Sequence, residues 1–273
     1  MTVGCTHVTR PETITIGPAH EVLVPAIVNG TRLTLQLDTG ASTTSLTPAA
    51  RRLLGLRYSR PTNGGGAGGE LANVEWVFLR TLKVAGEVAY LLPATVIDLN
   101  AGGGAIDGVL GMDVLDRYAV EIDLRARRLV LHREGDTSFR SPELVWASYA
   151  PLERGQITLG ITVEGRPTTA ILDLGANRTF ANLRAGLAPD DAEETVSAAV
   201  GADGHRIQFH AVSDVHIGFG ELALKARSVW IGDLPIFRTL GLADQPMVLL
   251  GTDVLAGRRI VIDPFARRVY LSR

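Results

Sequence analysis

Two aspartates, Asp38 and Asp173, each come directly after a strand-like apolar run and are each followed by x-Gly-Ala. A carboxylate at the end of a strand is positioned by a rigid element, and a nearby glycine lets a tight turn bring the backbone close to a ligand. Two carboxyl groups about 3 Å apart cannot both be charged, so they share one proton. Such a pair can activate a water molecule for attack on a peptide carbonyl and protonate the leaving group, with no metal or other cofactor.

The segments around the two aspartates repeat one another. Residues 24–44 align without a gap to residues 159–179, and residues 109–115 align to residues 249–255 at an offset that is five residues larger. A loop between the two blocks can absorb the difference, and a repeat on this scale indicates a duplicated structural unit. The predicted organisation is an N-terminal lobe, a connector and a C-terminal lobe: residues 12–136, 137–150 and 151–273.

Within each lobe the pattern of apolar residues is typical of β-structure. Residues 33–37 alternate between apolar and polar side chains, and turn residues recur between such runs. The pairs Asn29-Gly30 and Glu164-Gly165 lie between strand-like runs and predict hairpin turns. The predicted fold class is therefore mainly β.

The helical signals are short. Residues 48–56 follow Thr47, a candidate N-cap, and Pro48 suits the first helical turn. Residues 114–118 predict a second short helix. Four further aspartates repeat between the lobes, and we interpret them as structural because helix and turn ends favour this residue: Asp113, Asp253, Asp123 and Asp263.

Two motifs carry a resemblance to a known family. The first comprises Asp38, Thr39, Gly40, Ala41 and Ser42, and the second comprises Asp173, Leu174, Gly175 and Ala176. With the apolar-apolar-Gly triplets at residues 109–111 and 249–251, they resemble the retropepsin and pepsin clan of aspartic peptidases. The resemblance implies two retropepsin-like β-barrel lobes with a central cleft, a catalytic dyad of Asp38 and Asp173, and support of the dyad by the other motif residues. It implies a single chain that pairs its own two lobes, as pepsins do, and hence a monomer.

In that family a β-hairpin flap closes over an extended peptide, which binds by strand addition. Residues 63–69 lie where the first flap is expected, and residues 200–205 lie where the second is expected. The implied substrate-binding residues are Gly66, Ala67, Gly68, Gly201, Ala202 and Asp203. The implied partner is a peptide or protein substrate.

The second motif departs from the family at Leu174, where the family has Thr or Ser. In the family those hydroxyls cross-link the two aspartate loops, and a leucine side chain cannot form these bonds. Two functions are therefore weighed: an aspartic endopeptidase, and a catalytically degenerate peptide-binding or regulatory protein that retains the fold. A third, weaker alternative is an obligate dimer in which like lobes pair between chains.

Composition excludes several classes of protein. Hydrophobic residues make up 46% of the chain and aromatic residues only 5%, which predicts a folded protein with an aliphatic core. A net charge of −2 provides no basic field for nucleic acid. The single Cys5 and the lack of an H-E-x-x-H motif argue against a metal site, and no apolar run reaches 18 residues, so no membrane span is expected. As written the chain is soluble and its compartment unknown, although residues 2–5 resemble the end of a bacterial lipoprotein signal, which would imply a periplasmic or lipoprotein origin.

Overall fold

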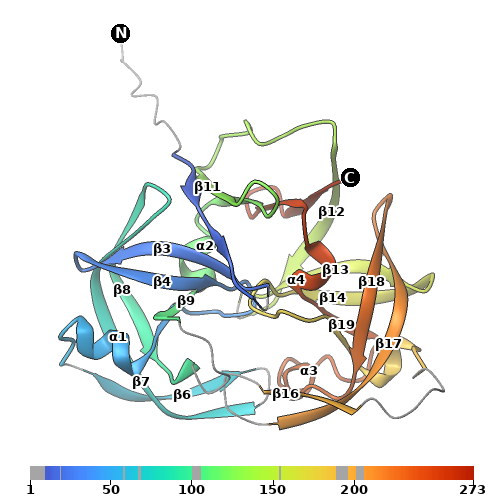
Figure 1. The fold of residues 1–273 in the computed structure, drawn as a ribbon, viewed down its shortest axis with the longest axis horizontal. Coiled ribbons are helices and arrows are strands. Elements are labelled where there is room, and N and C mark those ends of the chain that lie inside the picture. Colours follow the sequence, from blue (N-terminus) through green and yellow to red (C-terminus); the bar gives the residue numbers. More distant parts are fainter. Residues whose placement is uncertain are drawn as a thin grey trace.

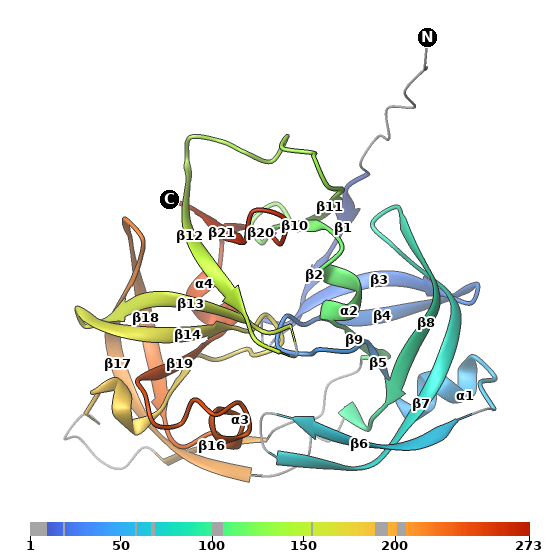
Figure 2. The same ribbon diagram turned by 180° about the vertical axis from the view of Figure 1, so that it is seen from behind.

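The computed structural model describes residues 10–18, 20–57, 59–66, 69–99, 106–153, 155–188, 196–200 and 206–273. This part of the chain is mainly β-structure with two closed six-strand barrels, as the sequence predicts. Figure 1 shows the barrel of the first half, in blue to green, beside that of the second half, in yellow to red. Figure 2 shows the same arrangement from behind.

The first barrel closes because β3 pairs antiparallel with both β4 and β7. Its interior is aliphatic, and Leu33, Leu35 and Leu37 of β4 alternate into it as the sequence pattern predicts. The sheet runs in the order β2-β3-β4-β9-β5-β8-β7-β6. Its strands are β2 (Thr15–Ile16), β3 (Val22–Val28), β4 (Thr31–Leu37), β5 (Ser45–Leu46), β6 (Arg60–Gly66), β7 (Gly69–Val84), β8 (Glu87–Val96) and β9 (Gly108–Leu110).

The second barrel repeats this connectivity, and it closes through the pairing of β13 with both β14 and β17. An apolar cluster separate from the main core includes Phe180, Phe209 and Phe237 of this half. Its strands are β13 (Ile157–Val163), β14 (Arg166–Leu172), β15 (Phe180–Ala181), β16 (Val196–Val200), β17 (Arg206–Phe219), β18 (Leu222–Ile231) and β19 (Met247–Leu250).

The sheet of the second barrel continues into strands from both halves of the chain. There β10 and β20 pair antiparallel, so the two halves share one hydrogen-bonded ladder. The strand β12 begins within the predicted connector and pairs with both β21 and β13. These strands are β1 (Glu12–Thr13), β10 (Ala119–Asp123), β11 (Arg128–His132), β12 (Leu144–Pro151), β20 (Arg259–Asp263) and β21 (Arg268–Ser272).

The helices are short. Thr47 caps the first, as predicted, by accepting a bond from the Ala50 amide at 3.2 Å, but the helix ends at Leu53 rather than at residue 56 because Gly55 turns left-handed with φ +64°. The second begins earlier than predicted, directly after Gly111. The helices are α1 (Pro48–Leu53), α2 (Met112–Leu115), α3 (Pro235–Thr239), α4 (Thr252–Leu255) and the 3-10 helix η2 (Leu183–Ala185). Within the described ranges, none is of a length and apolarity that would traverse a bilayer.

The two predicted hairpin turns are confirmed. Asn29 and Gly30 have φ of 50° and 90°, and Glu164 and Gly165 have φ of 47° and 76°. Two successive left-handed residues are the signature of the type I′ turn that matches the twist of a two-residue hairpin. The turns join β3 to β4 and β13 to β14, the strands that lead to the two aspartates.

Candidate active site

Each predicted catalytic aspartate lies at the end of an equivalent strand, Asp38 after β4 and Asp173 after β14. These strands pair parallel with β9 and β19. The Asp38 amide donates to the Leu110 carbonyl at 3.1 Å, and the Asp173 amide donates to the Leu250 carbonyl at 3.0 Å. The apolar-apolar-Gly triplets therefore anchor the backbone of the aspartates.

The turn after each aspartate folds back onto its carboxylate. In both halves the backbone amides of the second and third residues after the aspartate donate to the same carboxylate oxygen, Oδ1. Gly40 and Ala41 donate to Asp38 at 2.7 and 2.9 Å, and Gly175 and Ala176 donate to Asp173 at 2.8 and 3.1 Å. Both carboxylates are thus oriented by backbone dipoles, which favour the charged form.

The structure brings the two carboxyl groups together. They share a side-chain hydrogen bond. A β-carbon on Gly40 would lie 2.7 Å from the carboxyl carbon of Asp173, and one on Gly175 would overlap the carboxyl group of Asp38. Glycine is therefore required at both positions, because each loop backbone packs directly against the opposite carboxyl group.

Burial controls the electrostatics of the pair. It raises the pKa of Asp38, although the amides of Ala41 and Gly40 and the bond with Asp173 act in the opposite direction. Burial, followed by the charge of Asp38, raises the pKa of Asp173 well above its ordinary value. Two carboxyl groups in contact, with Asp173 buried and Asp38 partly buried, retain one proton between them over a wide pH range. One group can then act as a base while the other acts as an acid.

Thr39 joins the two aspartate loops. Its hydroxyl donates to the carbonyl of Leu172 at 2.7 Å and accepts from the amide of Leu174 at 3.0 Å. Thr39 is 1% exposed, so these bonds are shielded from water. Leu174 is fully buried at the equivalent position of the second loop and has no hydroxyl with which to return the bonds.

A second connection was missed in the sequence. The Gln36 side-chain amide donates to the carbonyl of Gly175 at 2.8 Å, which links β4 to the second aspartate loop. The available signal was the repeat itself, because the residue aligned with Gln36 in the second half is Ile171. A polar residue in only one of two matched strands indicates a contact that the other half does not make.

The repeated Asp113 and Asp253 hold the aspartate loops to the short helices, which supports the structural interpretation. The hydroxyl of Thr44 donates to Asp113 at 2.7 Å, and that of Thr179 donates to Asp253 at 2.7 Å. The amide of Gly111 donates to the Thr44 hydroxyl at 3.2 Å, so the loop and the start of α2 form one unit. The two Thr residues were aligned in the repeat but had been given no role.

The remaining predicted site residues are placed differently. Ser42 lies exposed on the surface. Gly66 ends β6 and pairs with Gly69 across the first predicted flap. Five predicted flap residues lie outside the described residues, as do residues 2–5: Ala67, Gly68, Gly201, Ala202 and Asp203.

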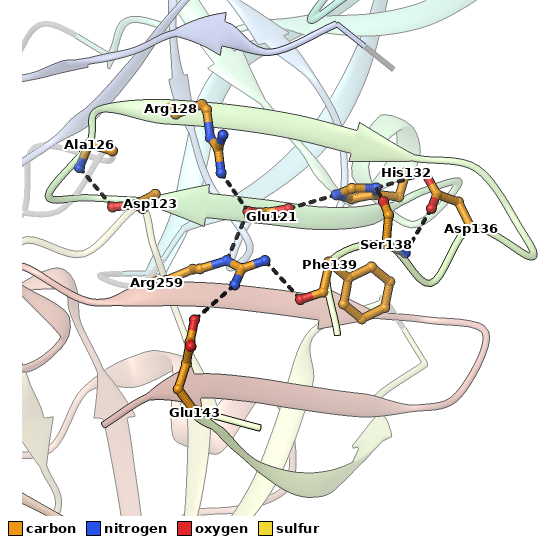
Figure 3. A network of polar contacts seen from close by, with 10 residues as sticks. All are labelled: Glu121, Asp123, Ala126, Arg128, His132, Asp136, Ser138, Phe139, Glu143 and Arg259. Carbon is orange, nitrogen blue, oxygen red and sulfur yellow. Dashed lines mark hydrogen bonds and ion pairs between the residues drawn. The ribbon is translucent and has the colours of Figure 1, made fainter. Parts of the chain in front are cut away.

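A second polar cluster lies between β10, β11 and β20 (Figure 3). His132 contacts Ser138 at 3.4 Å, Asp136 at 2.9 Å and Glu121 at 2.8 Å, which superficially resembles a nucleophile, a base and an acid. However, each ring nitrogen faces a carboxylate. Although burial lowers the pKa of His132, the bonds with Glu121 and Asp136 outweigh it and raise the pKa. Both ring nitrogens are engaged by carboxylates, so neither is free to accept a proton from Ser138, which supports a structural ion-pair network.

The comparisons concern the first half of the chain. Residues 24–114 match the aspartyl protease family model. The matched segment contains Asp38, its loop, the first barrel and the triplet of β9. No curated protein matches the chain. In the described part of the molecule, no group of three or more His, Cys, Asp or Glu side chains could hold a metal ion. The match supports, at a general level, a hydrolase of the peptidase type.

Proposed function

We propose that the chain is an aspartic endopeptidase whose dyad consists of Asp38 and Asp173. The observation that carries the proposal is the contact between the carboxyl groups of Asp173, which is buried, and Asp38, which is partly buried. Each is oriented by two amides of its own loop. Burial and mutual repulsion separate their proton affinities, which is the arrangement required for one group to act as base and the other as acid. The aspartyl protease match over residues 24–114 agrees with this chemistry.

In the proposed reaction the ionised carboxylate removes a proton from a water molecule as the water oxygen attacks the peptide carbonyl carbon. The protonated carboxyl group of the pair donates to the carbonyl oxygen, so a neutral gem-diol forms. As the diol collapses, the carboxyl group that took the water proton donates it to the departing amine, and a diol hydroxyl returns a proton to the other carboxylate, so the pair again holds one proton. The shorter amide bonds to Asp38, at 2.7 and 2.9 Å, support its role as the ionised member.

We further propose that residues 12–136 and 151–273 are the two lobes of one monomeric enzyme, joined by residues 137–150. The Thr39 bonds to Leu172 and Leu174 support this pairing within one chain. The hairpins β6–β7 and β16–β17 extend from the two barrels toward the same side of the molecule (Figures 1 and 2). We propose that they act as the flaps that close over a peptide substrate.

The test is cleavage of an unbiased peptide library between about pH 3 and 7, the range in which a carboxyl pair shares a proton. Asp38→Asn and Asp173→Asn keep the side-chain shape and should each reduce kcat by about 10²- to 10⁴-fold. Asp214→Asn is the matched control, because Asp214 is exposed and pairs only with Lys225 in the described contacts. Absence of cleavage by the wild type would contradict the enzyme proposal, and loss of activity in only one dyad variant would contradict a shared dyad.

The second candidate function is peptide binding without catalysis, and the specific observation that favours it is the apolar Leu174 in the loop contact. The same library separates the two functions. A peptide-binding protein retains peptides without producing new termini, and its affinity for them does not depend on the proton shared by Asp38 and Asp173.

A further inference from the structure

The side-chain bonds described between the aspartate loops all originate in the first half of the chain. Thr39 contributes two of them, to Leu172 and Leu174, and Gln36 contributes the third, to Gly175. Leu174 would be the source of the return bonds, but its side chain carries no polar atom. The side-chain connection between the two aspartate loops is therefore one-sided.

Comparison of the equivalent strands shows the same asymmetry. Gln36 of β4 is partly buried and reaches across to the second loop. Its counterpart Ile171 is 1% exposed and packs with Phe180 and Leu249 in an apolar cluster separate from the main core. A polar side chain thus occurs in the strand that faces the loop lacking a hydroxyl, and an apolar one in the strand that faces the intact loop.

The bond from Gln36 reaches the dyad through a single peptide unit. The carbonyl of Gly175, which accepts from Gln36 at 2.8 Å, and the amide of Ala176 belong to the same planar group. That amide donates to Asp173 Oδ1 at 3.1 Å. A donor at the carbonyl end fixes the orientation of the peptide and polarises it, which strengthens the hydrogen bond made at its amide end.

We propose that Gln36 is a positioning residue that holds the second aspartate loop against the first, taking the place of the hydroxyl that residue 174 lacks. Through the Gly175–Ala176 peptide it fixes the Ala176 amide on Asp173. The inference rests on the proposed peptidase activity, because its consequence is for the reactivity of the pair. Gln36 need not contact the substrate to exert this effect.

Two kinetic effects follow from removal of the Gln36 amide. The loop is held less firmly, so kcat falls by about fivefold to tenfold, the rate equivalent of one net hydrogen bond, while KM changes little. The Asp173 carboxylate also loses support from Ala176, so the pair gives up its second proton less readily. The alkaline limb of the pH dependence of kcat therefore moves to higher pH.

The experiment compares kcat, KM and the pH profile of the full-length wild type with those of Gln36→Met, which keeps the length of the side chain but has no donor. Gln245→Met is the control, because it makes the same replacement at an exposed position outside both loops. In a Leu174→Thr background, where the second loop carries a hydroxyl, Gln36→Met should cost less than about twofold in kcat. If Gln36→Met does not fold, Gln36→Glu replaces it, since its protonated form can donate to Gly175 and its ionised form cannot.

The outcomes separate the two proposals. A fall in kcat with a shifted alkaline limb, relieved by Leu174→Thr, supports the role of Gln36. An active wild type with an unchanged profile in Gln36→Met, or with equal loss in both backgrounds, overturns that role and leaves the peptidase proposal intact. A wild type that cleaves no peptide overturns the peptidase proposal and, with it, the role of Gln36.

Discussion

Thr39→Val tests how much the one-sided connection contributes to stability. Valine keeps the shape of threonine but removes the hydroxyl that bonds Leu172 at 2.7 Å and Leu174 at 3.0 Å. Both backbone partners would remain buried without this hydroxyl, and each such loss costs about 1 to 3 kcal/mol. We expect the free energy of unfolding to fall by about 2 to 6 kcal/mol, a large part of the roughly 5 to 15 kcal/mol typical of folded proteins.

The assay is urea denaturation followed by circular dichroism, with a thermal scan beside it. The expected loss corresponds to a decrease in Tm of about 5 to 15 °C. Thr39→Ser is the control, because it keeps the hydroxyl and loses only one methyl group, worth about 1 kcal/mol. If Thr39→Ser destabilises the protein as much as Thr39→Val does, the hydroxyl does not join the loops in the way the geometry indicates.

Three further predictions follow from the structure. Leu174→Thr should add bonds to the opposite loop and raise Tm or kcat; a decrease in both would show that the loop is packed around leucine. Asp173→Asn should raise the free energy of unfolding at neutral pH, because burial and then Asp38 raise the pKa of Asp173, and the gain should disappear below pH 3.8, where the unfolded chain is also protonated. Burial raises the pKa of Glu121, but bonds with His132 and Arg259 outweigh this effect and lower the pKa to about 2. The stabilisation by Glu121 is therefore full above pH 4.5 and is lost as the pH falls toward 2. The pKa of His132 is raised, so its stabilisation is full below pH 6.5 and decreases at higher pH. Urea titrations across pH should therefore show the largest cost of Glu121→Gln between pH 4.5 and 6.5, and a cost independent of pH would contradict the linkage.

The features that the sequence predicts well are local or repeated. The pair Asn29-Gly30 determines its turn type because both residues adopt left-handed conformations, so the turn depends little on the neighbouring residues. The contact between Asp38 and Asp173 could be predicted because the same motif occurs twice and two copies of one fold pair most simply about a twofold axis. A short helix is harder to place, since the start of α2 depends on the Thr44 bond to Gly111 rather than on helix propensity.

The repeat marks positions that differ between the halves, but it could not predict the partners of those residues. The alternating pattern of the strand predicts only that Gln36 is a polar residue facing away from the barrel interior. Its partner Gly175 can be identified only from the packing of the two barrels against each other. Most of β12 falls within the predicted connector, because its pairing with β21 joins segments far apart in the chain. Pairings of this kind are determined by tertiary packing and leave little trace in local patterning.

The register between β10 and β20 has a consequence for how copies of the chain can associate. Val120 pairs with Ile262, Glu121 with Val261, and Ile122 with Ile260, so a local twofold axis passes through the central pair of this ladder. Two copies of β10 in the same register would place Glu121 opposite Glu121 in the middle of a buried ladder, where like charges repel. In the present pairing Arg259 contacts Glu121, whereas a homotypic pair would lack Arg259 and keep only Arg128 and His132 beside each Glu121. The ladder therefore favours the pairing of β10 with β20 over the pairing of β10 with a second β10, because only the unlike pairing brings Arg259 to Glu121.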